Sequence, residues 1–268
     1  LNCKVNEIYF TSGGSESDNM ILKGIAFANK HKGNHIITSK IEHPAILNTC
    51  KFLEKFGFKI TYINAKPNGI IDLNELEKAI NRNTILIRIM FANNEMGAIQ
   101  DIESIGKLIK ENSTRARFHV DAVQSYGKLN IDVKKMNIDM LTVAGHKIHG
   151  PKGVGFTFVK KGIVLNPLIS GGSQESGIRG GTHNVPGIIG LHKAAELTME
   201  NINSNFEYVS ILKEYMIDKL GEINNIRINS PARADFSPYI LNVSFIGVRA
   251  EVLLHLLEEN DIYVATGS

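Results

Sequence analysis

The chain has 268 residues, of which 43% are hydrophobic and 21% are charged. These fractions are typical of globular domains and exclude a disordered, fibrous or low-complexity protein. Thirty Lys and Arg against 27 Asp and Glu give a net charge of +3, with both signs interleaved, so no nucleic-acid surface is indicated. No apolar run approaches the ~20 residues that span a bilayer, so we expect no membrane insertion. Two cysteines cannot build a disulfide framework, which favours a reducing, cytoplasmic compartment.

Over the first 160 residues, short β-branched runs alternate with longer stretches of helical period. This alternation predicts an α/β domain with a mostly parallel sheet and right-handed crossovers. Chemistry is then expected at the carboxyl edge of the sheet, where the loops face a common crevice. The predicted strands are Glu7–Thr11, His35–Ser39, Lys59–Ile63, Thr84–Phe91, Phe118–Asp121 and Asp139–Val143. The predicted helices are Glu16–Lys30, Ala45–Phe56 with an apolar stripe of Ile46, Cys50, Leu53 and Phe56, Leu73–Ile80, and Ile102–Asn112.

The pattern changes after Lys147, where several glycines lead into an apolar run over Phe156–Val159. Residues 170–182 form a Gly-rich loop without hydrophobic period, and its length is typical of functional loops. The segments that follow are predicted as a long helix over 186–220, a strand over 239–245, a helix over 250–259 and a strand over 262–265.

Two domains are predicted from this order of elements. The large one covers residues 1–185, and residues 186–268 form a linking helix and an incomplete small domain. The last predicted strand is followed by nothing that could close its layer, and the first residue is Leu without a signal-peptide pattern. We therefore expect the chain to be a fragment of a longer protein.

Small residues separate the first predicted strand from the first predicted helix, in the segment TSGGSESDN at residues 11–19. Backbone N–H groups near Gly14 and the Ser15 hydroxyl would lie at the positive end of the helix, which predicts a phosphate cradle. A plain strand-to-helix turn with Ser15 as N-cap accounts for the same residues.

Asp121 lies at the carboxyl tip of a predicted central strand. An acid there is costly to bury unless it meets a cation, and a protonated pyridine nitrogen is such a partner. The alternative is an Asp that caps a short helix.

Lys147 follows a predicted buried strand and has glycines on both sides that would admit a bulky ligand. Desolvation there would lower its pKa, as a lysine that forms an imine requires. Lys152 is the rival candidate, although it lies between Pro151 and Gly153 in a predicted turn, and a solvated basic loop is the more generic interpretation. The histidine pairs 146/149 and 31/35 lack a third ligand at suitable spacing, so we predict no metal site.

Two further motifs follow predicted strands. His43 could stack on a planar cofactor and move protons near neutral pH, although lone histidines more often cap helices or pack. Asn93 and Asn94 could hydrogen-bond a phenolic oxygen or a substrate carboxylate, but a turn would use them equally well. Together, the five motifs supply a phosphate cradle, a ring stacker, an oxygen partner, a pyridinium partner and an amine at one sheet edge. This combination predicts a site for pyridoxal 5'-phosphate.

The chain resembles the cysteine desulfurases of the class V aminotransferase family over essentially its whole length. The resemblance implies the aspartate aminotransferase-like fold of PLP-dependent transferases, a homodimer, and conversion of L-cysteine to L-alanine. Sulfur would pass to an enzyme cysteine and then to an acceptor protein, for iron–sulfur assembly or RNA thiolation. The matching segments are TSGGSESDN, IEHPAILNTC, NGIIDLNELEKAI, FANNEMG, HVDAVQSYGKL, AGHKIHGPKGVG and RGGTHNV.

The same resemblance implies the roles of individual residues. Lys147 would attach the cofactor, His43 would stack on its ring and transfer protons, and Asp121 would pair with the ring nitrogen. Asn94 and Gln124 would hydrogen-bond on the phenolate side of the ring. The phosphate would be held by Gly14, Ser15 and His146, together with Thr182 of a second subunit.

The chain departs from the family pattern in two ways. Ala144 stands where family members often carry a serine that reaches the phosphate, which removes a hydrogen bond of about 1.5 to 3 kcal/mol. The nucleophilic cysteine of the family is expected just beyond Ser268, and neither Cys3 nor Cys50 is suitably placed to replace it. We therefore expect the 268-residue chain itself not to release sulfur.

Three alternatives remain open from the sequence. The first is another enzyme on this fold, such as a selenocysteine or cysteine-sulfinate lyase. The second is a non-catalytic interaction module. The third, nucleotide binding by the glycines at 150, 153 and 155, lacks the strand-before and helix-after context and a suitably placed acid for a ribose.

Overall fold

The computed structural model describes residues 1–267, which form two compact units. Unit 1 consists of Leu1–Phe91 and Gln100–Ile202, and unit 2 consists of Ala92–Ile99 and the chain from Asn203 onward. Segment 92–99 therefore belongs to unit 2, although unit 1 surrounds it in the sequence. Ser268, after which the sequence analysis expects a nucleophilic cysteine, lies outside the described residues.

Unit 1 contains a seven-stranded sheet in the order β1-β7-β6-β5-β4-β2-β3. The neighbours among β2 to β6 pair in parallel, and β7 runs antiparallel to both β1 and β6. The prediction of an α/β fold with a mostly parallel sheet is confirmed. The strands are β1 Ile8–Thr11, β2 His35–Ser39, β3 Lys59–Ile63, β4 Thr84–Met90, β5 Arg117–Asp121, β6 Met140–Ala144 and β7 Gly155–Val159.

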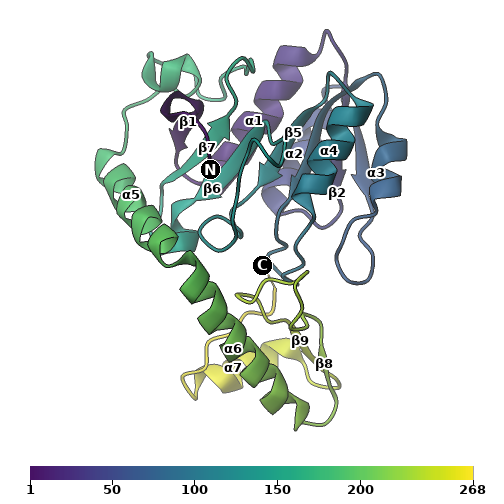
Figure 1. Ribbon diagram of the computed structural model, residues 1–268, viewed down its shortest axis with the longest axis vertical. Coiled ribbons are helices and arrows are strands. Elements are labelled where there is room, and N and C mark those ends of the chain that lie inside the picture. Colours follow the sequence, from purple (N-terminus) through teal and green to yellow (C-terminus); the bar gives the residue numbers. More distant parts are fainter. Residues whose placement is uncertain (268) are drawn as a thin grey trace. The chain divides into compact units, whose positions relative to one another are not determined.

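Helices cover both faces of this sheet, with α1 and α2 on one face and α3 and α4 on the other (Figure 1). This arrangement follows from right-handed crossovers between parallel strands. None of the helices formed by residues 1–267 has the length and apolar character needed to cross a bilayer. The helices of unit 1 are α1 Gly14–Asn29, α2 Pro44–Glu54, α3 Leu73–Ala79, α4 Ile102–Asn112 and α5 Val185–Glu200, with short 3-10 turns η1 Val5–Glu7, η2 Gly145–Ile148 and η3 Gln174–Gly177.

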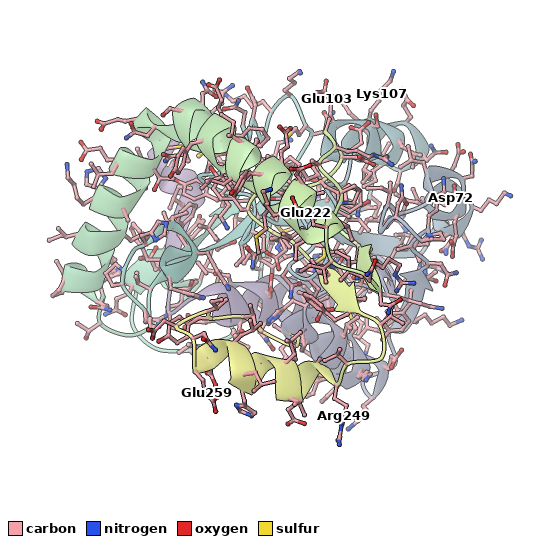
Figure 2. The ribbon with its side chains drawn as sticks, turned by 90° about the horizontal axis from the view of Figure 1, so that it is seen from below. Asp72, Glu103, Lys107, Glu222, Arg249 and Glu259 are labelled. Atoms are coloured by element: carbon pink, nitrogen blue, oxygen red, sulfur yellow. The ribbon has the colours of Figure 1, made fainter. Side chains whose placement is uncertain are left out.

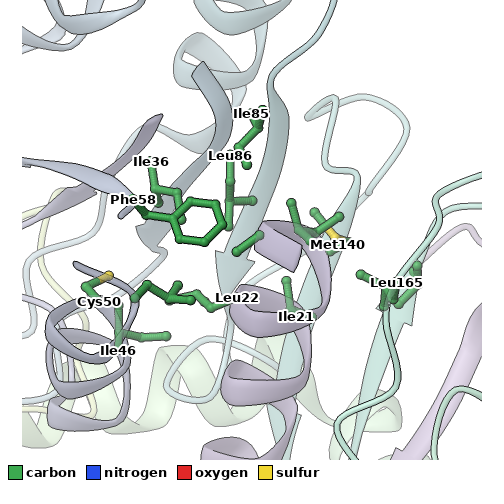
Figure 3. Close-up of a cluster of buried hydrophobic side chains, with 14 residues drawn as sticks. Ile21, Leu22, Ile36, Ile46, Cys50, Phe58, Ile85, Leu86, Met140 and Leu165 are labelled. Atoms are coloured by element: carbon green, nitrogen blue, oxygen red, sulfur yellow. The ribbon is translucent and has the colours of Figure 1, made fainter. Parts of the chain in front are cut away.

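The core between the sheet and the helices α1 and α2 is apolar (Figure 3). Ile36, Leu86 and Met140 from three strands meet the two helices there. The predicted α2 stripe is buried except for Phe56, which is 46% exposed because α2 ends at Glu54, before the stripe is complete. The helix residues of this core are Ile21, Leu22, Ile25 and Ala26 of α1, and Ile46, Cys50 and Leu53 of α2.

On the face of the sheet covered by α3 and α4, apolar and charged side chains are divided as expected. Ile102, Ile105 and Ile109 of α4 are buried, whereas Glu103 and Lys107 of the same helix point outward (Figure 2). This periodicity is what anchors α4 to the sheet.

Unit 2 contains α6 Ile202–Gly221, the antiparallel pair β8 Ile226–Ile228 and β9 Val243–Phe245, and α7 Ala250–Glu258. The prediction of one continuous helix over 186–220 is wrong, because Asn201 leaves the helical conformation between α5 and α6. Its side-chain amide donates to the Leu197 carbonyl at 2.9 Å, and such local bonds compete with helix continuation. The three-residue strand β8 was not predicted, since so short a segment carries no readable alternation.

The predicted strand over 262–265 is also wrong. Asp261 adopts a left-handed conformation with φ of 58°, and the Ile262 N–H is used to close α7 by donating to the Leu257 carbonyl. Among the described residues, the small sheet contains only β8 and β9, so this segment has no strand to pair with.

Candidate active site

Loops at the carboxyl edge of the unit 1 sheet carry most of the predicted site residues (Figure 1). Because β1, β2, β5 and β6 run in the same direction, the segments that follow them lie along one edge. The residues concerned are Gly14 and Ser15 after β1, His43 after β2, Gln124 after Asp121 at the end of β5, and His146 and Lys147 after β6.

The first turn of α1 lies directly against three strand ends. A Cβ atom on Gly14 would be 3.0 Å from Val123 Cγ2 and 3.7 Å from the Ala144 Cβ. A Cβ atom on Gly155 would be 2.8 Å from the Gly13 Cα. Gly13, with φ of 147°, occupies the N-cap position, so the alternative in which Ser15 caps the helix is wrong.

Gly155→Ala is expected to displace the start of α1, because the added methyl would press on Gly13. The methyl cannot move away from Gly13, since it would also lie 2.5 Å from the Val143 carbonyl oxygen in the neighbouring strand. Overpacking of this kind costs about 1 to 3 kcal/mol. Chemical denaturation should show the loss, and the affinity for pyridoxal phosphate should fall with it. Gly153→Ala is the control, because its Cβ would meet no atom within 4 Å, although its positive φ carries a backbone strain of its own. Unchanged cofactor affinity in Gly155→Ala would contradict the predicted cradle.

Asp121 is only 6% exposed, and both of its carboxylate oxygens have partners. Oδ1 accepts a hydrogen bond from the Val123 backbone N–H at 2.8 Å. Oδ2 accepts one from the Arg88 guanidinium, also at 2.8 Å. The capping alternative therefore accounts for the contact of Oδ1. The contact of Oδ2 is with a buried cation, Arg88, from the neighbouring strand β4.

Arg88 belongs to a buried cluster that the sequence analysis missed. Its guanidinium also donates to Glu42 and lies 3.6 Å from Asp18 Oδ1. His119 completes the cluster through Thr142, whose Oγ1 is 3.0 Å from Nε2. Burial lowers the pKa of His119 well below its ordinary value, and Arg88 adds to this effect, so the imidazole is neutral. In the sequence, the only signal was a charged residue inside an otherwise apolar strand.

Burial favours the protonated form of Asp18 in this cluster. Burial raises its pKa to about 8, and the charge of Asp121 adds to the rise while Arg88 opposes it. An unfolded chain ionises such a carboxyl near pH 4. The folded state therefore binds an additional proton between these values, and this group makes stability fall as the pH rises from about 4 to 8.

Asp18→Asn is expected to remove that dependence, since the amide has the shape of the protonated acid and does not ionise in this range. Relative to the unaltered protein, the variant should gain stability with rising pH. Urea unfolding at pH 5 and pH 8 measures the difference. If the difference in unfolding free energy between Asp18→Asn and the unaltered protein is the same at pH 5 and pH 8, Asp18 does not titrate in this way.

Lys147 lies in the short turn η2, and a second amine that the sequence analysis missed lies in its field. Burial lowers the pKa of Lys128 to about 8, and the charge of Lys147 contributes. The pKa of His146 is also lowered, by burial first and then by Lys147 and Lys152. Burial and neighbouring positive charge both disfavour the charged forms of these groups, and a phosphate placed among them would favour those forms. The rival candidate, Lys152, is exposed in a turn.

His43 is the N-cap of α2, and its Nδ1 accepts a hydrogen bond from the Ala45 N–H at 3.1 Å. The capping interpretation is therefore correct for one ring nitrogen, and the proton of the neutral ring lies on Nε2. A cavity of about 440 Å³ opens beside this residue between α1 and α2. It is lined by Ser15, Asn19, Lys23, His43, Pro44, Ala45, Asn48, Thr49 and Phe52.

Two predicted residues belong to segments other than the loops that follow β1, β2, β5 and β6. Asn94 belongs to unit 2, where the neighbouring Asn93 forms the predicted turn by accepting from the N–H groups of Glu95 and Met96. Thr182 is exposed on the Gly-rich loop of unit 1. That loop is joined to the first turn of α1 through Arg179, which donates to Glu16 at 2.8 and 3.3 Å.

The residues at this edge fit pyridoxal phosphate. Lysine and histidine side chains near the start of α1 suit its phosphate, and the buried Asp121 suits a protonated ring nitrogen. Lys147 offers an amine after β6, which lies between β1 and β5 in the sheet. Gln124 is held by Lys128, whose Nζ donates to its Oε1 at 3.2 Å. The amide nitrogen of Gln124 is thereby left to donate in another direction.

Residues 1–268 match the family model for Aminotransferase class-V, and the chain belongs to this family. It is 50% identical to Cysteine desulfurase IscS of Clostridium botulinum (strain Hall) over 272 residues, which covers all of this chain and 68% of that relative. A solved NifS-like protein is 40% identical with a TM-score of 0.96, covering 99% of this chain and 72% of the other. SspA in complex with cysteine is 39% identical with a TM-score of 0.83, covering 100% and 74%.

Proposed function

We propose that the chain is the cofactor-binding part of a pyridoxal-phosphate-dependent cysteine desulfurase, which takes sulfur from L-cysteine and leaves L-alanine. The observation that carries the proposal is geometric: His146 and Lys147 after β6 and the first turn of α1 lie at the same sheet edge as the buried carboxylate of Asp121. The similarity to cysteine desulfurases over the whole chain, and to a structure that holds cysteine, supports the choice of substrate. The two unpaired cysteines favour a reducing, cytoplasmic compartment.

Each side chain has a distinct task in this proposal. Lys147 would hold the cofactor through its Nζ. Asp121 keeps the proton on the ring nitrogen by a charge-assisted hydrogen bond in a dry environment. His43 holds a proton on Nε2 and can transfer it at the substrate. When bound, pyridoxal phosphate supplies an electron-accepting ring that stabilises negative charge developing on the substrate.

The remaining contacts orient the cofactor. The proposed phosphate ligands on this chain are Gly14, Ser15 and His146, at the positive end of α1. Thr182 is proposed to join them from a second subunit, which makes the active form a homodimer. Gln124 and Asn94 are proposed to hydrogen-bond on the phenolate side. An acceptor protein would take the sulfur onward, with iron–sulfur cluster assembly as the proposed use.

Sulfur transfer also needs a thiolate that reaches the substrate sulfur. Cys50 is fully buried among apolar side chains, and burial raises the pKa of its thiol to about 12, so it does not supply that thiolate. Burial also raises the pKa of Cys3. We assign the transfer to neither of them.

The test measures sulfide and alanine in the protein expressed from its whole coding sequence, with pyridoxal phosphate, L-cysteine and a dithiol reductant. The two products are expected in equal amounts. A Cys3→Ala/Cys50→Ala double variant should retain this activity. Faster turnover of L-cysteine sulfinate or L-selenocysteine would favour the corresponding lyase, and absence of product from all three substrates would overturn the proposal.

A further inference from the structure

Arg88 is an unusual residue for the centre of a sheet. It is fully buried in β4, between Ile87 and Ile89, which are also fully buried. Removing a guanidinium from water costs several kcal/mol, and apolar side chains of similar volume usually serve a core at least as well. A charge at this position therefore calls for a reason other than packing.

The strand register shows where the charge acts. Arg88 is paired with His119, and Met90 with Asp121, so Arg88, His119 and Asp121 all lie on one face of the sheet. Leu86, two residues before Arg88, belongs to the apolar core on that same face. The face thus changes from apolar to polar toward the carboxyl edge, and Arg88 lies between the core and the proposed cofactor site.

The contacts of Arg88 are directed at the carboxylate of Asp121. One nitrogen donates to Asp121 Oδ2 at 2.8 Å, and the other donates to Glu42. Glu42 is itself fixed, because its Oε1 accepts from the Ser39 hydroxyl at 2.6 Å and from the Met90 N–H at 3.0 Å. The Val123 N–H holds the second oxygen of Asp121, so the plane of that carboxylate is set by two independent donors.

We propose that Arg88 is a positioning residue for the cofactor site, and that it acts through Asp121 by fixing the carboxylate that receives the cationic ring nitrogen. The inference rests on the proposed function. Arg88 is fully buried beneath Asp121 and acts on the ligand only through it. Glu42 accepts a hydrogen bond from the other guanidinium nitrogen and thereby fixes the orientation of Arg88.

The test is a double-mutant cycle on the dissociation constant of pyridoxal 5'-phosphate, followed by absorbance in the purified protein. Arg88→Lys keeps the positive charge but cannot donate to Glu42 and Asp121 from two separate nitrogens. Arg88→Met removes both the charge and the donors, and it leaves the buried Glu42 without its cation. With Asp121 present, Arg88→Lys should weaken binding by about tenfold and Arg88→Met by more. In an Asp121→Asn background, either change should alter the constant by less than about twofold.

Ile89→Val is the matched control, since it removes a buried methylene from the same strand and lowers stability without touching Asp121. Its dissociation constant should be unchanged. Equal losses of affinity for Arg88→Lys in both backgrounds, or no loss with Asp121 present, would show that Arg88 only supports the fold and would overturn the inference. Failure of the unaltered protein to bind pyridoxal phosphate would instead overturn the proposed function, and this inference with it.

Discussion

Borohydride reduction of the pyridoxal-phosphate-loaded protein is expected to leave the pyridoxyl group on Lys147, and Lys147→Ala is expected to abolish the label. The physical reason is position, because Lys147 follows the buried strand β6 at the edge where His146 and the start of α1 also lie. A covalent bond to the cofactor aldehyde forms only from an amine that reaches it. Peptide mapping by mass spectrometry identifies the labelled residue.

Two other lysines make this experiment discriminating. Lys152 is exposed in a turn, so Lys152→Ala should label as fully as the unaltered protein. Lys128 is the stronger rival, since burial lowers its pKa to about 8 and makes its free amine more available near neutral pH. Label recovered mainly on Lys128 or Lys152 would contradict the assignment of Lys147.

Asp121→Asn is expected to leave pyridoxal phosphate bound but to slow the spectral change that follows addition of L-cysteine. A neutral amide cannot balance the charge of a protonated ring nitrogen, so the ring loses much of its capacity to accept electrons. Loss of one preorganised electrostatic contact of this kind costs a factor of about 10² to 10³ in rate. Stopped-flow absorbance at saturating L-cysteine measures it.

The matched control for this prediction is Asp132→Asn. Asp132 is a carboxylate at the surface of unit 1, whose Oδ2 accepts from Asn2 at 3.0 Å and whose Oδ1 accepts from the backbone N–H groups of Lys134 and Lys135. An amide oxygen can keep the backbone bonds, so Asp132→Asn changes the net charge equally without affecting the site. Circular dichroism and the cofactor dissociation constant establish that each variant is folded and loaded. An unchanged rate in Asp121→Asn would refute the proposed role of Asp121.

The local pattern of the sequence was sufficient to predict the sheet and the edge at which chemistry is expected. Strand and helix periods depend on side chains within a few residues of one another, and parallel strands necessarily end at a common edge. The positions of His43, Asp121 and Lys147 after their strands followed from this reasoning alone.

Other features depend on partners that are distant in the sequence. The missing strand at 262–265 and the break at Asn201 show that apolar runs become strands or continuous helices only when pairing and backbone bonds permit it. Phe56 has the correct helical spacing and is nevertheless exposed, because α2 ends two residues earlier.

The buried cluster around Arg88 was determined by the tertiary structure only. In the sequence, Arg88 interrupts an apolar run, Asp18 lies in a polar helix start, and Glu42 precedes a histidine, with no pattern that joins them. Their meeting is set by the register of β4 beside β5 and by the packing of α1 on the sheet. The sequence by itself therefore determined the fold class and which groups lie along the edge, because those follow from local period and strand direction. The partners that fix Asp121 and keep the proton on Asp18 were determined by the three-dimensional packing, because burial and charge act through space between segments far apart in the chain.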